Sequence, residues 1–126
     1  MRSIQLNLAS IDDLAPYKKE MVQAGLFFAK TTQYFKVLNE CGDHIGFTGL
    51  MIKSKKARIK NSFVFPNARR LGYFHAIMIE SIGICKMLGC TKADAIVTAM
   101  SKGWYDKSGW RLIKTYKDFW HYETDL

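Results

Sequence analysis

The sequence has 126 residues, enough for a buried core, and we expect a single domain over residues 1–126. With 48% apolar and 24% charged residues, the composition excludes a disordered chain, and no stretch approaches the ~18 consecutive apolar residues of a membrane span. The 19 basic and 11 acidic residues give a net charge of +8. This surplus favours anionic partners, although a basic surface that only keeps the chain dispersed is an equal alternative.

The N-terminus and the cysteines indicate a cytoplasmic protein. No long apolar segment follows Met1, so we predict no signal peptide. Cys41, Cys85 and Cys90 are an odd number of cysteines, which favours free thiols in a reducing compartment. Because the three histidines are scattered and the cysteine spacing fits no zinc motif, we predict no metal site.

The first half of the chain predicts a strand, a helix and three further strands. Apolar residues alternate over 4–8, and Ser10 with Asp13 forms a capping box that begins a helix ending at Gly25. The segment 26–32 has no clear prediction. Strands follow over 34–40, 45–53 and 57–65, joined by short turns. The alternation of the last strand puts one set of side chains on each face: Ile59, Phe63 and Phe65 on one, and Arg58, Lys60, Ser62 and Val64 on the other.

The second half predicts a long helix, a strand, a short helix and two final strands. The helix spans 73–88 and ends at Gly89. Its predicted buried stripe is Phe74, Ile77, Met78, Ser81, Ile82, Cys85 and Leu88. The later elements cover 93–100, 101–108, 112–116 and 119–123. The order β-α-β-β-β-α-β-α-β-β is typical of an α/β (α+β) sheet with helices on its faces.

The segment 64–74 carries the strongest functional signal. A strand ends at Pro66, and a short loop with Arg69 and Arg70 leads through Gly72 into the long helix. The first amides of a helix lack intrahelical partners and, with the helix dipole, favour an anion. Gly72 allows the backbone to approach a ligand closely. The segment therefore predicts a pyrophosphate site, and the alternative is a plain connection with exposed arginines.

This segment resembles the acetyl-CoA-binding motif of the GNAT N-acetyltransferase superfamily, Val-x-Pro-x-x-Arg/Gln-x-x-Gly-x-Gly/Ala. The matching residues are Val64, Pro66, Arg69 and Gly72, while Phe74 replaces the small final residue. A second segment, 104–110, reads Trp-Tyr-Asp-Lys-Ser-Gly-Trp and is similar to the Phe-Tyr-Glu-Lys-x-Gly-Phe that family members often carry after the fifth strand. The predicted order of elements also matches the family over nearly the whole chain.

The resemblance implies the GNAT acyl-CoA N-acyltransferase fold, a mixed central sheet whose parallel fourth and fifth strands splay apart, with helices on both faces. Acetyl-CoA, the co-substrate, would lie in that opening. Its pantetheine arm would pair with the backbone at 63–65, and its pyrophosphate would bind amides at 70–75. The implied donor-binding residues are Phe63, Val64, Phe65, Arg69, Arg70, Leu71, Gly72, Tyr73, Phe74 and His75.

The resemblance also implies a catalytic role for Tyr105, at the tyrosine of the second motif. Its phenol would donate a proton to the leaving thiolate, and an amide near Val64 would stabilise the thioester oxygen. Many family members carry a glutamate base on the fourth strand, where this chain has Arg58, Lys60 and Ser62. A water chain, His44, Glu40 or no base at all are the alternatives, and we assign none.

The acceptor is indicated only by charge. Arg58 and Lys60, with three lysines at 53, 55 and 56, favour an anionic acceptor such as a nucleotide, nucleic acid or an acidic protein patch, and a solvated turn is the commoner alternative. One clear N-terminal helix, where the family usually has two, predicts an open groove suited to a macromolecule. The C-terminal aromatics favour core packing or a homodimer surface over base stacking.

The sequence thus predicts an acetyl-CoA-dependent N-acetyltransferase. The main alternative is an inactive GNAT-fold binding or structural module, like the compact GNAT-like chains of viruses or mobile elements. A basic nucleic-acid-binding domain unrelated to CoA is a third reading.

Overall fold

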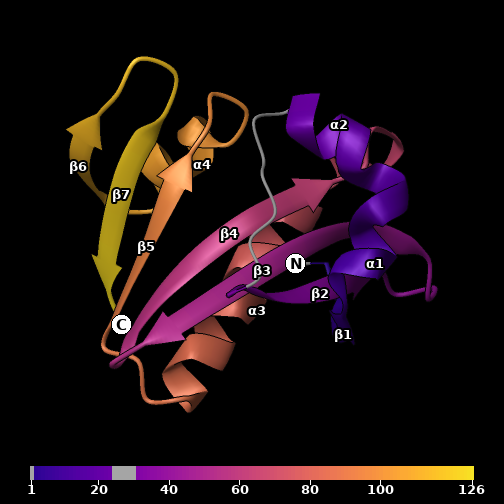
Figure 1. Cartoon of the computed structure of the whole chain (residues 1–126), viewed down its shortest axis with the longest axis horizontal. Helices are drawn as coiled ribbons and strands as arrows, with labels where there is room; N and C mark the ends of the chain where they lie inside the picture. The colour runs from indigo at the N-terminus through magenta and orange to yellow at the C-terminus, as the bar shows by residue number, and fades with distance from the viewer. Residues whose placement is uncertain (1, 24–30) are drawn as a thin grey trace.

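The computed structural model describes residues 2–23 and 31–126, and its elements follow the predicted order (Figure 1). The predicted helix end at Gly25 and the segment 26–30 lie outside the described residues. The strands are β1 (Gln5–Ala9), β2 (Gln33–Leu38), β3 (His44–Lys53), β4 (Lys56–Val64), β5 (Lys92–Val97), β6 (Arg111–Thr115) and β7 (Trp120–Asp125). The helices are α1 (Ile11–Leu14), α2 (Lys18–Gln23), α3 (Tyr73–Met87) and α4 (Lys102–Lys107), with 3-10 turns η1 (Ala15–Tyr17) and η2 (Pro66–Ala68).

The described strands form one mixed sheet in the order β1-β2-β3-β4-β5-β7-β6. β4 and β5 pair in parallel, and the remaining neighbours pair antiparallel. The long connection through α3 makes this parallel pairing possible, because parallel neighbours need a crossover of a dozen or more residues. The α/β class and the mixed sheet with helices on both faces are confirmed.

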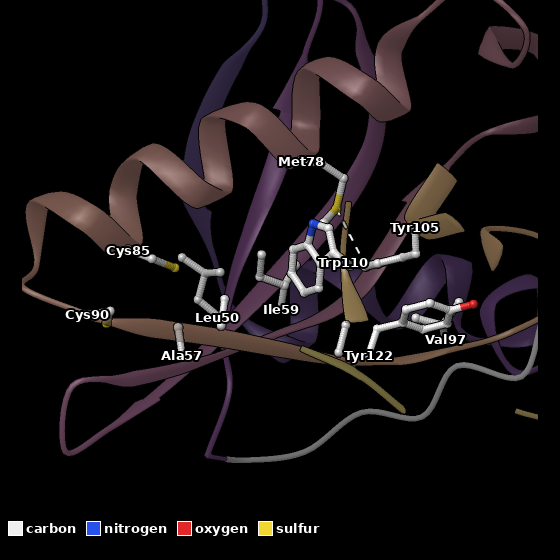
Figure 2. Close-up of a cluster of buried hydrophobic side chains, with 12 residues drawn as sticks. Leu50, Ala57, Ile59, Met78, Cys85, Cys90, Val97, Tyr105, Trp110 and Tyr122 are labelled. Carbon is white, nitrogen blue, oxygen red and sulfur yellow. Dashed lines mark hydrogen bonds between the residues drawn. The ribbon is translucent and has the colours of Figure 1, made fainter. Parts of the chain in front are cut away.

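Helices cover the two faces of the sheet unequally. On one face, Met78 and Cys85 of α3 and Tyr105 of α4 pack in one apolar cluster with Ile59 of β4 (Figure 2). On the other, Leu14 of α1 and its neighbour α2 pack over β2, β3 and the end of β4. On that second face, no described helix covers β5, β7 and β6 (Figure 1). We call this face of β5, β7 and β6, which no described helix covers, the open face.

A β-bulge divides β4 into two halves with opposite alternation. Gly49 lies opposite Lys60 and Phe47 opposite Phe63, so two residues of β4 face the single residue between Phe47 and Gly49. The backbone of Asn61 takes φ 56°, as expected for an extra residue in a ladder.

The bulge overturns the predicted faces of this strand. Ile59 packs in the cluster beneath α3, whereas Phe63 and Phe65 pack on the face of α1 and α2. Val64 returns to the α3 face and packs with Ile77. The prediction that Ile59, Phe63 and Phe65 share one face is therefore wrong, because period-two alternation does not continue through an inserted residue.

The element bounds differ from prediction in three further places. Pro16 lies in η1, which separates α1 from α2, so the N-terminal region has two short α-helices where one was predicted. Leu88, expected in the buried stripe, is 63% exposed just after α3 ends. β5 ends at Val97, three residues before its predicted end, and the chain turns there toward α4.

Within the described ranges, no helix is long and apolar enough to span a bilayer. The capping box at the start of α1 is confirmed, since Ser10 and Asp13 exchange side-chain to backbone hydrogen bonds. The C-terminal aromatics divide between roles. Trp110 and Tyr122 lie in the core, whereas Tyr116 and Phe119 are exposed at the β6–β7 turn.

Candidate active site

The site is a cleft where β4 and β5 separate. The two strands pair at only three positions, the last being Arg58 with Asp94. Beyond that pair β4 runs to Val64 and β5 to Val97 without a common ladder. Side chains of β4, α3, β5 and α4 line the cleft, among them Ile59, Phe63, Phe74, Ile96, Ser101 and Tyr105. The predicted splay of the fourth and fifth strands is confirmed.

The start of α3 lies at the end of β4, beyond the 3-10 turn η2. Gly72 is its N-cap with φ 85°, and no side chain caps the first amides of the helix. Arg70 is also left-handed, at φ 63°. Left-handed residues before a run of uncapped helix amides are favourable to an anion. An open depression lined by Arg2, Leu71, Gly72 and His75 lies at this position.

The two loop arginines have different roles. The Arg69 Nε donates to the carbonyl oxygen of Val64 at 2.8 Å, and its guanidinium lies 5.1 Å from the centroid of the Phe63 ring. Arg69 therefore secures the end of β4. Arg70 is exposed, so its charge is available to a ligand at the loop.

Arg2 is a residue that the sequence did not indicate. Its Nε donates to the carbonyl oxygen of Leu71 at 2.9 Å, and its guanidinium lies 5.2 Å from the centroid of the Tyr73 ring. Tyr73 in turn donates to a Glu40 carboxylate oxygen at 2.5 Å, and this bond lowers the pKa of Glu40 and raises the pKa of Tyr73. No local pattern signals a contact between residues this far apart in sequence.

Phe74 and His75 connect α3 to α4 through Trp104. The rings of Phe74 and Trp104 are nearly parallel, with centroids 5.9 Å apart, and Trp104 Nε1 donates to His75 Nδ1 at 3.0 Å. Phe74 replaces the small residue of the motif, and here its ring is accommodated against the indole. The result is a bridge between the two helices that flank the cleft.

Tyr105 lies at the inner wall of the cleft. Its hydroxyl donates to Met78 Sδ at 3.8 Å, and the side chain is only 4% exposed (Figure 2). Burial raises the pKa of Tyr105 far above its usual range. The phenol is therefore protonated and is already directed at a sulfur atom.

The open face of the sheet is less basic than the sequence indicated. Arg58 donates two hydrogen bonds of 2.9 Å to Asp94, and Lys56 donates to Glu123 at 3.1 Å. Carboxylates of β5 and β7 thus partly neutralise two of the cations that the sequence places on this face. Lys53, Lys56 and Arg58 still line a depression on this face that contains one carboxylate, that of Asp94.

The two residues suggested as a base lie away from the cleft. Glu40 contacts Tyr73 near the start of α3. The His44 Nε2 lies 3.0 Å from the carbonyl oxygen of Gly46, and the imidazole packs against three aromatic rings, those of Tyr17, Phe47 and Phe65. Burial lowers the pKa of His44. Neither residue lines the cleft between β4 and β5.

Comparison with known proteins rests on structure. No protein-family model and no curated protein sequence matches this chain. The PaiA N-acetyltransferase of Thermoplasma acidophilum, solved with coenzyme A, is similar with a TM-score of 0.76 at 16% identity, over 98% of this chain and 99% of that one. The spermidine/spermine N-acetyltransferase SpeG of Vibrio cholerae has a TM-score of 0.78 at 12% identity, over 97% and 93% of the two chains.

A GNAT-family acetyltransferase of Staphylococcus aureus has a TM-score of 0.74 at 14% identity, over 98% of this chain and 99% of that one. These alignments extend over almost the full length of both partners, and they include the splayed β4–β5 pair that frames the cleft. The chain therefore has the fold of the GNAT N-acetyltransferases.

Proposed function

We propose that this protein binds acetyl-CoA in the cleft between β4 and β5 and transfers the acetyl group to an amine. The observation that carries the proposal is the early end of β4–β5 pairing at Arg58 and Asp94, directly before a cleft that reaches Tyr105. The uncapped start of α3 near that cleft would bind the pyrophosphate. Similar folds belong to proteins described as N-acetyltransferases, one of them solved with coenzyme A.

The donor would lie along β4. Beyond Arg58 no described strand pairs with the edge of β4 that faces β5. At 63–65 the Phe65 amide already donates to the Ile45 carbonyl and the Val64 carbonyl accepts from Arg69, so the pantetheine arm would pair with the remaining backbone groups. The pyrophosphate would accept hydrogen bonds from the amides at 70–75, with the charges of Arg70 and Arg2 beside it. The proposed donor-binding residues are therefore those predicted from the sequence together with Arg2, and Arg69 has a supporting role.

The chemistry would be direct transfer. The neutral amine attacks the thioester carbonyl, a C–N bond forms, and the C–S bond breaks. A backbone amide near Val64 would stabilise the charge that develops on the carbonyl oxygen. Tyr105 would donate its proton to the departing thiolate sulfur, in place of its present bond to Met78.

Ligand-induced stabilisation tests the donor site. At acetyl-CoA about a hundred times above its Kd, binding should add about 2.7 kcal/mol to the free energy of unfolding. Arg70→Glu should remove most of this gain because it places a negative charge beside the pyrophosphate. Lys86→Glu is the matched control, since it makes the same charge change at the opposite end of α3. No stabilisation of the unaltered protein would contradict the proposal.

A donor-binding protein without transfer is the second candidate. It is favoured by the Phe74–Trp104 stack beside the cleft and by Arg58 on the strand where many family members carry a glutamate. The two candidates are separated by chromatographic measurement of CoA release. Stabilisation by acetyl-CoA without amine-dependent release would support the second.

For the acceptor, we propose an amine that also carries an anionic group. The depression on the open face is lined by Lys53, Lys56 and Arg58, and these three cations outnumber Asp94 and Glu123, the carboxylates that pair with Lys56 and Arg58. The remaining positive charge would attract a phosphate or carboxylate and repel a polyamine. Phosphoethanolamine should therefore be acetylated faster than spermidine at low salt, and the reverse order would contradict this assignment.

A further inference from the structure

The direction from which an amine can reach the cleft is set by the helices. α3 and α4 pack over one face of β4 and β5, so that face is closed. On the opposite face no described helix covers β5 and β7 (Figure 1). An amine that attacks a thioester in the cleft therefore approaches from the open face.

A buried carboxylate lies on that face at the apex of the cleft. Asp94 is 2% exposed and belongs to the last β4–β5 pair. Burial by itself would raise the pKa of Asp94, but the hydrogen bonds of Arg58 and His121 and the charges of Arg58 and Lys56 outweigh it, so the pKa is lowered. Asp94 is therefore an anion at the apex near neutral pH.

His121 is held by this carboxylate. It lies on β7 opposite Ile96 of β5, and Ile96 lines the cleft. The His121 Nε2 is 3.0 Å from Asp94 Oδ2, and the imidazole is 19% exposed. An ionised carboxylate only accepts hydrogen bonds, so in the neutral imidazole Nε2 carries the hydrogen and Nδ1 is left as an acceptor.

We propose that His121 is the general base of the transfer, with Asp94 as the residue that positions it and Arg58 as the residue that positions Asp94. This inference rests on the proposed function. The Nδ1 of His121 takes the proton of the bound ammonium, the neutral amine forms the C–N bond as the C–S bond breaks, and the imidazolium then releases the proton to water. The second amine proton also passes to water, and the thiolate takes the proton of Tyr105, which water restores. The sum is an ammonium and acetyl-CoA giving an amide, CoA thiol and one proton.

Other charged residues surround the imidazole. Lys114 of β6 is opposite His121 in register, and Glu123 follows two residues later on β7. Lys56 and Arg58 of β4 reach Asp94 from the other side. Among these described groups only Asp94 is hydrogen-bonded to His121, so it is the carboxylate that holds the protonated imidazole after the proton has moved.

The test measures how the His121→Gln substitution changes the rate of acetyl transfer to two different amines. Phosphoethanolamine is mostly protonated near neutral pH and needs a base, whereas hydroxylamine is already largely neutral. We expect transfer to phosphoethanolamine to fall about a hundredfold and transfer to hydroxylamine to fall less than about threefold. With phosphoethanolamine, we divide the rate of the unaltered protein by the rate of His121→Gln. This ratio should be near one in acid and should rise with pH, because a protonated imidazole cannot act as a base.

Glu123→Gln is the matched control. It removes a carboxylate from the same strand and face, but Glu123 contacts Lys56, Lys92 and Arg111 and not His121. Its rate ratio between the two amines should match that of the unaltered protein. The assignment of the base would be overturned if His121→Gln lost activity equally with both amines, or if the ratio of unaltered to variant rate did not depend on pH. In both cases acetyl-CoA would still stabilise the protein. Loss of that stabilisation in the unaltered protein would instead overturn the proposed function and this inference together.

Discussion

Tyr105 illustrates how the surroundings of one side chain decide what it can do. Its ring lies among Trp104, Trp110 and Tyr122, and its hydroxyl has a thioether as its neighbour. A phenol in such a site does not ionise, so it cannot serve as a base. It can still donate a hydrogen bond, and a thiolate formed at the inner wall of the cleft is a much stronger acceptor than the Met78 sulfur.

Tyr105→Phe tests this role at the residue scale. We expect acetyl transfer to fall about a hundredfold. The free energy of unfolding should change by less than about 1 kcal/mol, since the lost bond to sulfur is weak. Chromatography of released CoA and urea unfolding measure the two effects.

Tyr122→Phe is the control for loss of a buried phenol. Tyr122 lies in the same cluster but donates to Asp106, so its loss should affect stability and leave transfer within about twofold. Unchanged transfer in Tyr105→Phe would contradict the proton-donor role.

The cysteines differ in reactivity for the same reason. Cys41 is exposed, whereas burial raises the pKa of Cys85 to about 11. Only the thiolate reacts readily, so iodoacetamide at about pH 8 should label Cys41 first and Cys85 only in denaturant. Peptide mass spectrometry measures the order, and labelling of Cys85 at the rate of Cys41 in the folded protein would contradict it.

At the scale of elements, β3 approaches β4 closely beside the bulge. A Cβ at Gly46 would lie 2.1 Å from the carbonyl oxygen of Phe63, which is backbone and cannot move aside. Gly46→Ala should therefore destabilise the protein by about 3 kcal/mol, at the upper end for overpacking. Urea unfolding measures this change.

Gly83→Ala supplies the comparison for Gly46. Its Cβ would meet nothing within 4 Å inside α3, so the same substitution should stabilise the protein by about 0.5–1 kcal/mol. Similar effects at the two positions would show that the contact between Gly46 and Phe63 does not constrain the sheet.

The Arg58–Asp94 pair is the second element-scale feature, because it joins β4 and β5 where they separate. Removing Arg58 leaves a buried carboxylate without its main partner, which typically costs 3–5 kcal/mol. Arg58 is itself 34% exposed, and solvent screening reduces the expected cost of Arg58→Met to about 2 kcal/mol. Lys56→Met, 3.6 Å from the same carboxylate and nearly half exposed, should cost less than about 1 kcal/mol.

The pH dependence of this pair has a definite sign. The pKa of Asp94 is lowered in the folded state, so the stability it contributes is present above its unfolded pKa and is lost as the pH falls through the folded value. The stability gap between the unaltered protein and Arg58→Met should therefore be largest near neutral pH and shrink in acid. Urea unfolding over a pH series checks this, and a gap that widens in acid would contradict it.

At the scale of the whole molecule, the site arises from topology. β4 and β5 belong to one sheet but begin to pair at one end only, and the chain between them folds back through α3. α3 and α4 then cover one face of the cleft, whereas no described helix covers β5 and β7 on the other face. Under the proposed function, the cleft would hold the donor between the two strands and the amine would enter from the open face.

Local signals in the sequence predicted much of this molecule. The order of elements, the capping box at Ser10, the start of α3 after Gly72 and the short helix that carries Tyr105 depend on propensities and spacings within about a turn of helix or a few strand residues. The two motifs and the splay that they imply also lie in contiguous segments. Such features can be predicted from the sequence because the residues that cause them are neighbours in the chain.

Tertiary structure alone decided the rest. The bulge at Asn61 reversed the faces of β4, because it depends on how β3 pairs with β4 and leaves no mark in the alternation. Arg2 contacts Leu71 in the loop before α3, and Asp94 binds both Arg58 and His121 at the apex of the cleft, through contacts between distant segments. A carboxylate or an imidazole acquires its partners only when the strands that carry it are brought side by side. The charge pattern of the sequence therefore indicated a basic face, and carboxylates from neighbouring strands neutralise much of that positive charge in the folded sheet.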